Sequence, residues 1–265
     1  MERENLKGRI DWITTLIPFV IVLAMMLVFM LIPTQSKIFV DTLRGFFGDT
    51  IGIYYVILGL GCVLLSLYLA FKDKYGQIKL GNIDKPVYSN FAWGTMIFTS
   101  TMAADIMFYS LIEWALYGAE PHVAELGKMQ LWAPTFPLFH WGPLAWGFYV
   151  VLAISFAFMM HVRKRERQRF SEAVRPLIGD RVDGSWGKVI DIVAVFAMVC
   201  ATATTFSLAT PLLASALASV LGISTSVTLT IGILLLICAV YTITVLLGMN
   251  GISKLASFCS YMFFA

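Results

Sequence analysis

One long stretch without charged residues limits the possible folds of this chain more than any other feature. Residues 192–253, 62 in all, contain no Asp, Glu, Lys or Arg. A helix of about 20 residues spans the hydrocarbon core of a bilayer, which is about 30 Å thick, so this stretch is long enough for two crossings. Its best candidate for a turn is residues 221–226 (LGISTS), a run of small and hydroxyl residues. The pattern predicts two membrane helices joined by a short turn.

The composition supports the same class of protein. Hydrophobic residues make up 59% of the chain and charged residues 13%, against roughly 45–50% and about 25% in soluble domains. So few charges cannot cover a soluble fold of this length. The four Cys lie singly in apolar runs, with no CxxC or Cys/His cluster that would suggest a metal site. We therefore expect an all-α integral membrane protein without a metal, an enzymatic site or a nucleic-acid surface.

Apolar windows separated by charged segments give the predicted membrane spans. These are residues 12–36, 50–71, 87–117, 138–162, 188–220, 226–248 and 254–265. The last window holds only 12 residues, about 18 Å of helix, which is too short to cross the bilayer. We therefore expect the chain to be the N-terminal part of a longer protein.

The distribution of Lys and Arg predicts the orientation. With a cytoplasmic N-terminus, 16 of the 19 Lys and Arg residues fall in inside segments, chiefly residues 163–188 with eight and residues 72–85 with four. Such an excess is typical of cytoplasmic loops. The basic run at residues 163–169 is interpreted as a topology anchor beside anionic lipid, with a regulatory site as the alternative.

Asp105 lies near the middle of the predicted span 87–117, where a carboxylate costs on the order of 3 kcal/mol. An acid at that depth is functional by default, while the alternative is a structural ion pair or a protonated, hydrogen-bonded acid. The mostly small residues 99–104 before it would allow close backbone approach or a helix break. Glu113 lies closer to the outer surface, and two interpretations stay open for it: a functional role, or a near-interface acid that simply reaches water.

Aromatic residues gather at residues 139–149 (FHWGPLAWGFY). On one helix, Trp146 would lie about 140° from Trp141, with Tyr149 between them at about 80°. Rings on one face can hold a cation, or they can belong to the aromatic belt at the membrane interface. His140 and His161 have no metal-ligand partner at helical spacing, so we expect packing or interfacial roles for both.

Hydroxyl residues follow at Thr202, Thr204, Thr205 and Ser207. Their oxygens could coordinate an ion. Hydroxyls within a helix also bond to their own backbone, so both interpretations stay open.

At these residues the sequence resembles the betaine/carnitine/choline transporter family, most closely its carnitine/γ-butyrobetaine exchanger branch. The matching motifs are residues 139–146 (FHWGPLAW), 162–164 (VRK), 175–180 (RPLIGD) and 207–212 (SLATPL). The resemblance implies a leucine-transporter-like fold of twelve spans, in which two N-terminal spans precede two inverted five-helix repeats. Residues 1–86 would then hold the two extra spans, and residues 87–265 most of the first repeat.

The resemblance also assigns roles to residues. Trp141, Trp146 and Tyr149 match the family's aromatic box, and residues 101–109 match its unwound stretch, which adds Met102, Asp105 and Tyr109 as substrate-binding candidates. Ala103 and Asp105 replace glycines of that stretch, and choline-carrying members similarly have Asp there. Ser260 stands where the carnitine branch has an arginine that replaces a sodium ion. Coupling to a sodium ion, coupling to a proton and exchange therefore all stay open, and no other cofactor is expected. The ion-coupling candidates are Asp105, Thr202, Thr205 and Ser260.

The predicted function is secondary active transport of a quaternary ammonium compound, such as choline, betaine or carnitine, across the cytoplasmic membrane by alternating access. The resemblance adds a possible homotrimer. The alternatives are transport of another organic cation or an amino acid on the same scaffold, or a non-transporting membrane sensor or subunit if the chain is complete at 265 residues.

Overall fold

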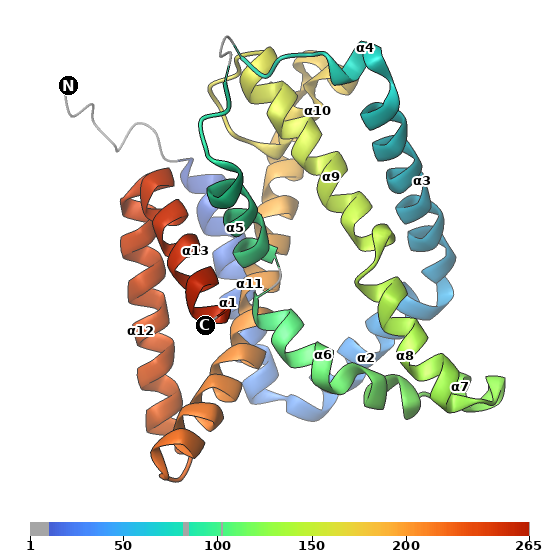
Figure 1. The fold of residues 1–265 in the computed structure, drawn as a ribbon, viewed down its shortest axis with the longest axis vertical. Helices are drawn as coiled ribbons and strands as arrows, with labels where there is room; N and C mark the ends of the chain where they lie inside the picture. The colour runs from blue at the N-terminus through green and yellow to red at the C-terminus, as the bar shows by residue number, and fades with distance from the viewer. Residues whose placement is uncertain (1–10, 82–84, 102, 265) are drawn as a thin grey trace. The chain divides into compact units, whose positions relative to one another are not determined.

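The computed structural model describes residues 11–81, 85–101 and 103–264, and all regular secondary structure in these ranges is helical. Figure 1 shows the helices in chain order. The α-helices are α1 (Trp12–Leu31), α2 (Pro33–Gly45), α3 (Gly52–Phe71), α4 (Asp73–Gly76), α5 (Asn90–Thr101), α6 (Ala103–Gly118), α7 (Pro121–Leu126), α8 (Met129–His140), α9 (Pro143–Ala157), α10 (Phe170–Ile178), α11 (Ser185–Leu221), α12 (Val227–Leu246) and α13 (Gly248–Phe264). Short π-helices η2 (Phe46–Thr50) and η3 (Phe158–Val162) follow α2 and α9, and the 3₁₀-helix η4 (Gly179–Asp183) follows α10.

Five helical segments of the described part are long and apolar enough to cross a membrane. They are Trp12–Leu31, Gly52–Phe71, Met129–Val162, Ser185–Leu221 and Val227–Leu246. Most of their apolar side chains are exposed; Leu31 and Leu246, for example, are 79% and 81% exposed. Apolar surface on this scale is stable beside lipid rather than water. The prediction of an all-α integral membrane protein is confirmed.

Two of these helices begin at side-chain caps. Asp11 accepts a hydrogen bond from the Thr14 N–H at the start of α1, at 3.3 Å, and Ser226 accepts one from the Leu229 N–H at the start of α12, at 3.1 Å. Such caps satisfy amides that have no partner within the helix. Because α11 ends at Leu221 and α12 begins with its cap at Ser226, the interval between them coincides with the turn predicted at residues 221–226.

The described residues form two compact units, one within residues 1–82 and 138–202 and the other within residues 83–137 and 203–265. In the first unit, α3 and α9 lie side by side (Figure 1). Glycines permit this close approach: a Cβ on Gly147 would lie only 2.8 Å from Val63 Cγ2, and one on Gly59 only 3.3 Å from the Phe148 ring. Small residues commonly let membrane helices approach in this way.

In the second unit, α13 packs against α5 and α12. The contact with α5 is aromatic, because the rings of Phe91 and Tyr261 lie 5.1 Å apart and those of Phe98 and Phe263 lie 5.2 Å apart. In the same interface, the hydroxyls of Thr95 and Ser257 lie 3.5 Å apart. The described contacts between α5 and α13 are therefore aromatic and polar.

The helices found in two predicted spans can be compared with the expected ones. The described parts of the span at residues 87–117 are helical, as α5 and α6, and Met102 between them lies outside the described residues. The span at residues 138–162 differs from the single helix expected after Pro137. Its first residues belong to α8, which begins at Met129 and includes Pro137, and a new helix, α9, begins at Pro143.

Candidate functional site

The aromatic cluster lies at the break between α8 and α9. Gly142 has an extended backbone with φ −84° and ψ −164°, and a Cβ on it would clash with the Leu138 carbonyl oxygen. Pro143 follows at the first position of α9, where the missing N–H costs nothing. The Gly-Pro pair therefore ends one helix and starts the next, and Trp141 lies just before α9 instead of on it.

A hydrogen bond joins the two tryptophans across this break. The indole Nε1–H of Trp146 donates to the backbone carbonyl of Trp141 at 2.9 Å. The Trp146 ring lies 5.6 Å from the Tyr149 ring with 40° between their planes, and the Trp141 ring stacks on His140 at 4.9 Å. The structure thus brings Trp141, Trp146 and Tyr149 together. The helical spacing from which their shared face was predicted applies only to Trp146 and Tyr149, because Trp141 precedes α9.

This arrangement suits the binding of an organic cation. Trp141 and Trp146 are half-buried and Tyr149 is 55% exposed, so ring surface is open to a ligand. A cation over such rings gains about 0.5–1 kcal/mol when exposed and about 2 kcal/mol when desolvated. The hydrogen bond to the Trp141 carbonyl also fixes the orientation of the Trp146 ring.

The other predicted substrate-binding residues belong to the second unit. Asp105 and Tyr109 lie on α6. The Asp105 side chain and Met102 lie outside the described part of the structure, and Tyr109 is half-buried. Glu113, one turn beyond Tyr109, is buried, with only 4% of its surface exposed, so the interpretation that its side chain reaches water is wrong. The roles of Met102, Asp105 and Tyr109 in binding stay predictions.

The predicted ion-coupling hydroxyls differ in burial. Thr202 and Thr205 are exposed on α11, and the Thr202 hydroxyl donates to the Met198 carbonyl at 2.8 Å. Ser260 on α13 is only 1% exposed, and its hydroxyl has no hydrogen-bond partner among the described residues. Burying a hydroxyl without a partner is costly. Of these three candidates, Ser260 therefore fits a polar ligand best.

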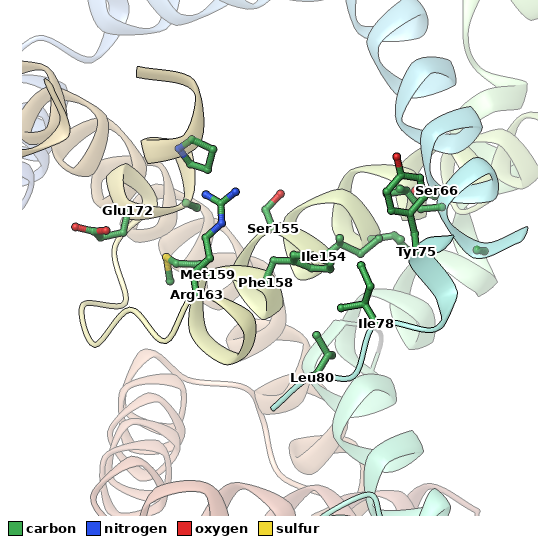
Figure 2. Close-up of a pocket in the computed structure, with 15 residues that line it drawn as sticks. Ser66, Tyr75, Ile78, Leu80, Ile154, Ser155, Phe158, Met159, Arg163 and Glu172 are labelled. Carbon is green, nitrogen blue, oxygen red and sulfur yellow. The ribbon is translucent and has the colours of Figure 1, made fainter. Parts of the chain in front are cut away.

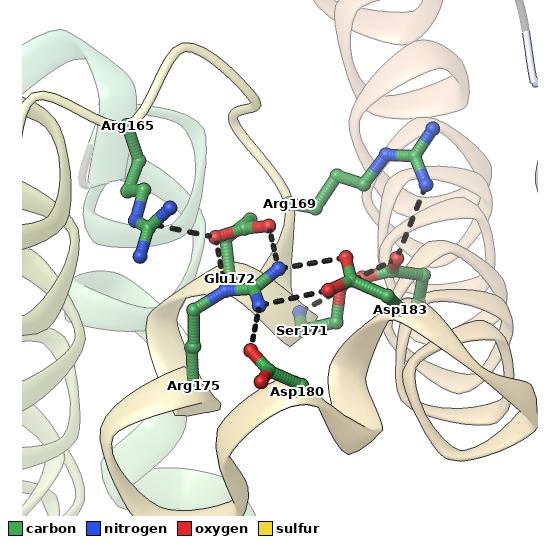
Figure 3. A network of polar contacts seen from close by, with 8 residues as sticks. Arg165, Arg169, Ser171, Glu172, Arg175, Asp180 and Asp183 are labelled. Atoms are coloured by element: carbon green, nitrogen blue, oxygen red, sulfur yellow. Dashed lines mark hydrogen bonds and ion pairs between the residues drawn. The ribbon is translucent and has the colours of Figure 1, made fainter.

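A polar network holds α10 in the first unit (Figure 3). The Asp191 carboxylate, on α11, accepts the backbone N–H of Ser171 at 2.9 Å and its hydroxyl at 2.8 Å. Arg169 places one guanidinium nitrogen 3.1 Å from Asp11 and another 4.0 Å from Asp191. Asp191 thus caps the first turn of α10 from another helix, a position where negative charge is favourable.

A second set of contacts ties α10 to η4. The Arg175 guanidinium donates to Glu172 at 2.6 and 2.9 Å and to Asp183 at 2.7 and 2.9 Å, and Asp180 accepts a longer bond at 3.4 Å (Figure 3). These hydrogen bonds from Arg175 hold the pKa of Glu172 and of Asp183 below their usual range. At the start of α1, the Thr14 N–H and, to a smaller extent, Arg169 lower the pKa of Asp11. The charges near α10 are therefore mostly paired.

Sequence reasoning did not find this network. Asp191 directly precedes the charge-free stretch 192–253 and Glu172 lies within the basic segment 163–188, and neither position by itself indicates a role. The available signal was the N-cap residue of α10. Arg169 has no side-chain oxygen that could accept a hydrogen bond from the first turn, and it makes no side-chain cap bond. A remote partner was required, and sequence spacing does not identify it.

The described residues define a multi-pass, all-helical membrane protein in which the span formed by α8 and α9 is interrupted, an arrangement that secondary transporters use at their binding sites. Residues 13–265 match the family described as betaine/carnitine/choline transporters, and the chain belongs to this family. The family prediction is confirmed, and the carnitine branch stays a prediction.

Two relatives illustrate the similarity. A probable glycine betaine transporter of Desulfitobacterium hafniense (strain Y51) is 34% identical over 182 residues, which cover 67% of this chain and 36% of the relative. An uncharacterized transporter, YeaV, of Escherichia coli (strain K12) is 28% identical over 205 residues, which cover 76% of this chain and 42% of the relative. The matched part of this chain thus covers about two fifths of either relative's length.

Proposed function

We propose that the protein takes part in secondary active transport of a quaternary ammonium compound across the cytoplasmic membrane. The observation that carries the proposal is the aromatic cluster, in which Trp146 is hydrogen-bonded to Trp141 and lies 5.6 Å from Tyr149. Trimethylammonium groups cannot donate hydrogen bonds, so their recognition depends on ring faces and desolvation. Family membership supports the same substrate class, and the probable glycine betaine transporter supports betaine as one candidate.

In this proposal the three rings contact the ammonium group. Asp105 supplies a carboxylate that balances a cationic substrate or takes up a coupling proton, and Met102 and Tyr109 complete the binding residues. Access alternates by movement of one helical repeat against the other. Sodium ion or proton coupling would involve the hydroxyl candidates, of which Ser260 is the buried one. A homotrimer follows from the family resemblance alone.

The test is a binding measurement on the protein expressed from its whole gene. Trp141→Leu and Trp146→Leu should each weaken choline or betaine binding by about 1–2 kcal/mol, roughly 5- to 30-fold. Trp146→Phe keeps a ring and loses the indole N–H, so it should lose less than Trp146→Leu. Trp186→Leu is the matched control, because Trp186 is 68% exposed at the start of α11 and outside the cluster.

A neutral analogue separates charge from shape. The uncharged compound 3,3-dimethyl-1-butanol has nearly the shape of choline, and it should bind much more weakly to the unmodified protein. Trp146→Leu should then reduce choline binding more than binding of the analogue. Equal binding of the two compounds, or unchanged choline affinity in both tryptophan variants, would contradict the proposal.

A further inference from the structure

The first unit contains a cavity of about 530 Å³ that none of the proposed transport residues lines. Its walls come from α3 and the segment after it, from α9 with η3, and from α10 (Figure 2). Most of the α9 lining lies away from the aromatic cluster, since Trp146 lies in the first turn of α9 and Ile154 and Ser155 near its end. Val150, the residue after Tyr149, also lines the cavity, but none of the three cluster residues does. The cavity volume lies within the range of about 300–1,000 Å³ typical of ligand sites.

The cavity is apolar along its walls and positively charged on one side. Leu69, Ile154 and Phe158 contribute apolar surface, and Arg163 contributes a guanidinium. Glu172 also lines it, but the negative charge of Glu172 is taken up by Arg175 at 2.6 Å and Arg165 at 3.9 Å. No ion pair joins Arg163 to a carboxylate of the described residues. The charge left for a ligand is therefore positive.

The two segments richest in Lys and Arg border this cavity. Residues 72–85 contain four basic residues, and Tyr75, Ile78 and Leu80 of this segment line the wall. Residues 163–188 contain eight basic and four acidic residues, a net charge of +4. The predicted orientation places both segments on the cytoplasmic side, where the bilayer leaflet carries anionic lipid and basic pockets between helices bind anionic headgroups.

We propose that this cavity binds one anionic phospholipid of the cytoplasmic leaflet. The phosphate lies at Arg163, and an acyl chain lies against Ile154 and Phe158. A quaternary ammonium substrate is a poor occupant, because Arg163 repels its charge and no tryptophan lines the wall. A small soluble anion would leave the apolar walls unused. The inference depends on the predicted orientation and not on the transport reaction.

The experiment measures lipid retention by native mass spectrometry on the protein expressed from its whole gene and purified in detergent. Phosphatidylglycerol and phosphatidylcholine with identical acyl chains are titrated separately. We expect one phosphatidylglycerol to be retained in preference to phosphatidylcholine. Arg163→Gln should weaken phosphatidylglycerol binding about fivefold, the effect of one basic residue near an anionic surface. Arg181→Gln is the control, since Arg181 belongs to the same basic segment and does not line the cavity.

A second pair of variants tests the apolar wall. Ser155→Phe should fill part of the cavity and reduce retention, whereas Ala153→Phe, on the same helix and outside the cavity, should not. Choline and betaine binding by each variant reports whether the fold is intact. Equal retention of both lipids, an equal effect of the two arginine variants, or displacement of the lipid by glycerol phosphate alone would each overturn the proposal.

Discussion

Removing the Asp191 carboxylate should destabilise the first unit more than removing any other acid near α10. Asp191 is 4% exposed and accepts two hydrogen bonds from Ser171, which is itself 3% exposed. In Asp191→Ala, the Ser171 N–H and hydroxyl lose their partner in a buried site, and Arg169 loses one of its two acids. A buried donor left without a partner costs about 1–3 kcal/mol, so the loss of both Ser171 contacts should cost about 3–5 kcal/mol.

Asp191→Asn should have a smaller effect. The amide oxygen can still accept the Ser171 N–H, and its NH₂ group can donate to the Ser171 hydroxyl. Asp191→Asn removes only the negative charge. That charge stabilises the fold because it strengthens the two hydrogen bonds from Ser171, attracts Arg169 at 4.0 Å and interacts favourably with the N-terminus of α10. We expect a loss of about 2 kcal/mol, between the unmodified protein and Asp191→Ala.

The measurement is thermal unfolding of the purified protein in detergent, followed by loss of the monodisperse peak in size-exclusion chromatography. Asp191→Ala should lower the midpoint by on the order of 10 °C. Asp180→Ala is the matched control, because the Asp180 side chain is 103% exposed and 3.4 Å from Arg175, so its contribution is that of a surface pair, about 0.5 kcal/mol. If Asp191→Ala and Asp180→Ala shift the midpoint equally, Asp191 does not cap α10.

Three further predictions address pH, packing and selectivity. Arg175 lowers the pKa of Glu172. The ionised Glu172 therefore stabilises the folded protein above the ordinary pKa of 4.5, and this stabilisation disappears as pH falls through the lowered pKa. In a thermal-unfolding series, Glu172→Gln should be less stable than the unmodified protein at pH 7 and equally stable at the acid end. Gly147→Ala places a Cβ 2.9 Å from a backbone nitrogen of α3 and should lower the free energy of unfolding by about 1–3 kcal/mol. Gly61→Ala is the control, because a Cβ there has nothing within 4 Å. Equal thermal-unfolding midpoints for the two variants would contradict this account of the α3–α9 contact. Asp105→Asn should reduce binding of choline but spare the zwitterion betaine, and Asp105→Gly should shift preference toward betaine; equal losses for both compounds would indicate a structural role.

The candidate site was only partly predictable from the sequence. The identities of Trp141, Trp146 and Tyr149 follow from their residue types and from the family motif. Their geometry does not, because Gly142 and Pro143 interrupt the helix and Trp141 reaches Trp146 through a backbone carbonyl. The burial of Ser260 is likewise a property of how α13 packs, and helical spacing alone gives it no more weight than Thr202.

The sequence by itself determined that this is an all-α membrane protein, because a bilayer admits only helices or closed barrels and imposes a minimum apolar length that can be counted along the chain. It also determined the turn after Leu221, where small residues and the Ser226 cap are local features. Only the tertiary structure decided that Asp191 caps α10, and that Arg163 borders a cavity together with residues of α3 and of the segment after it. These contacts join residues that are distant in the chain, so which side chains meet depends on helix packing, to which local propensity and hydropathy contribute no information.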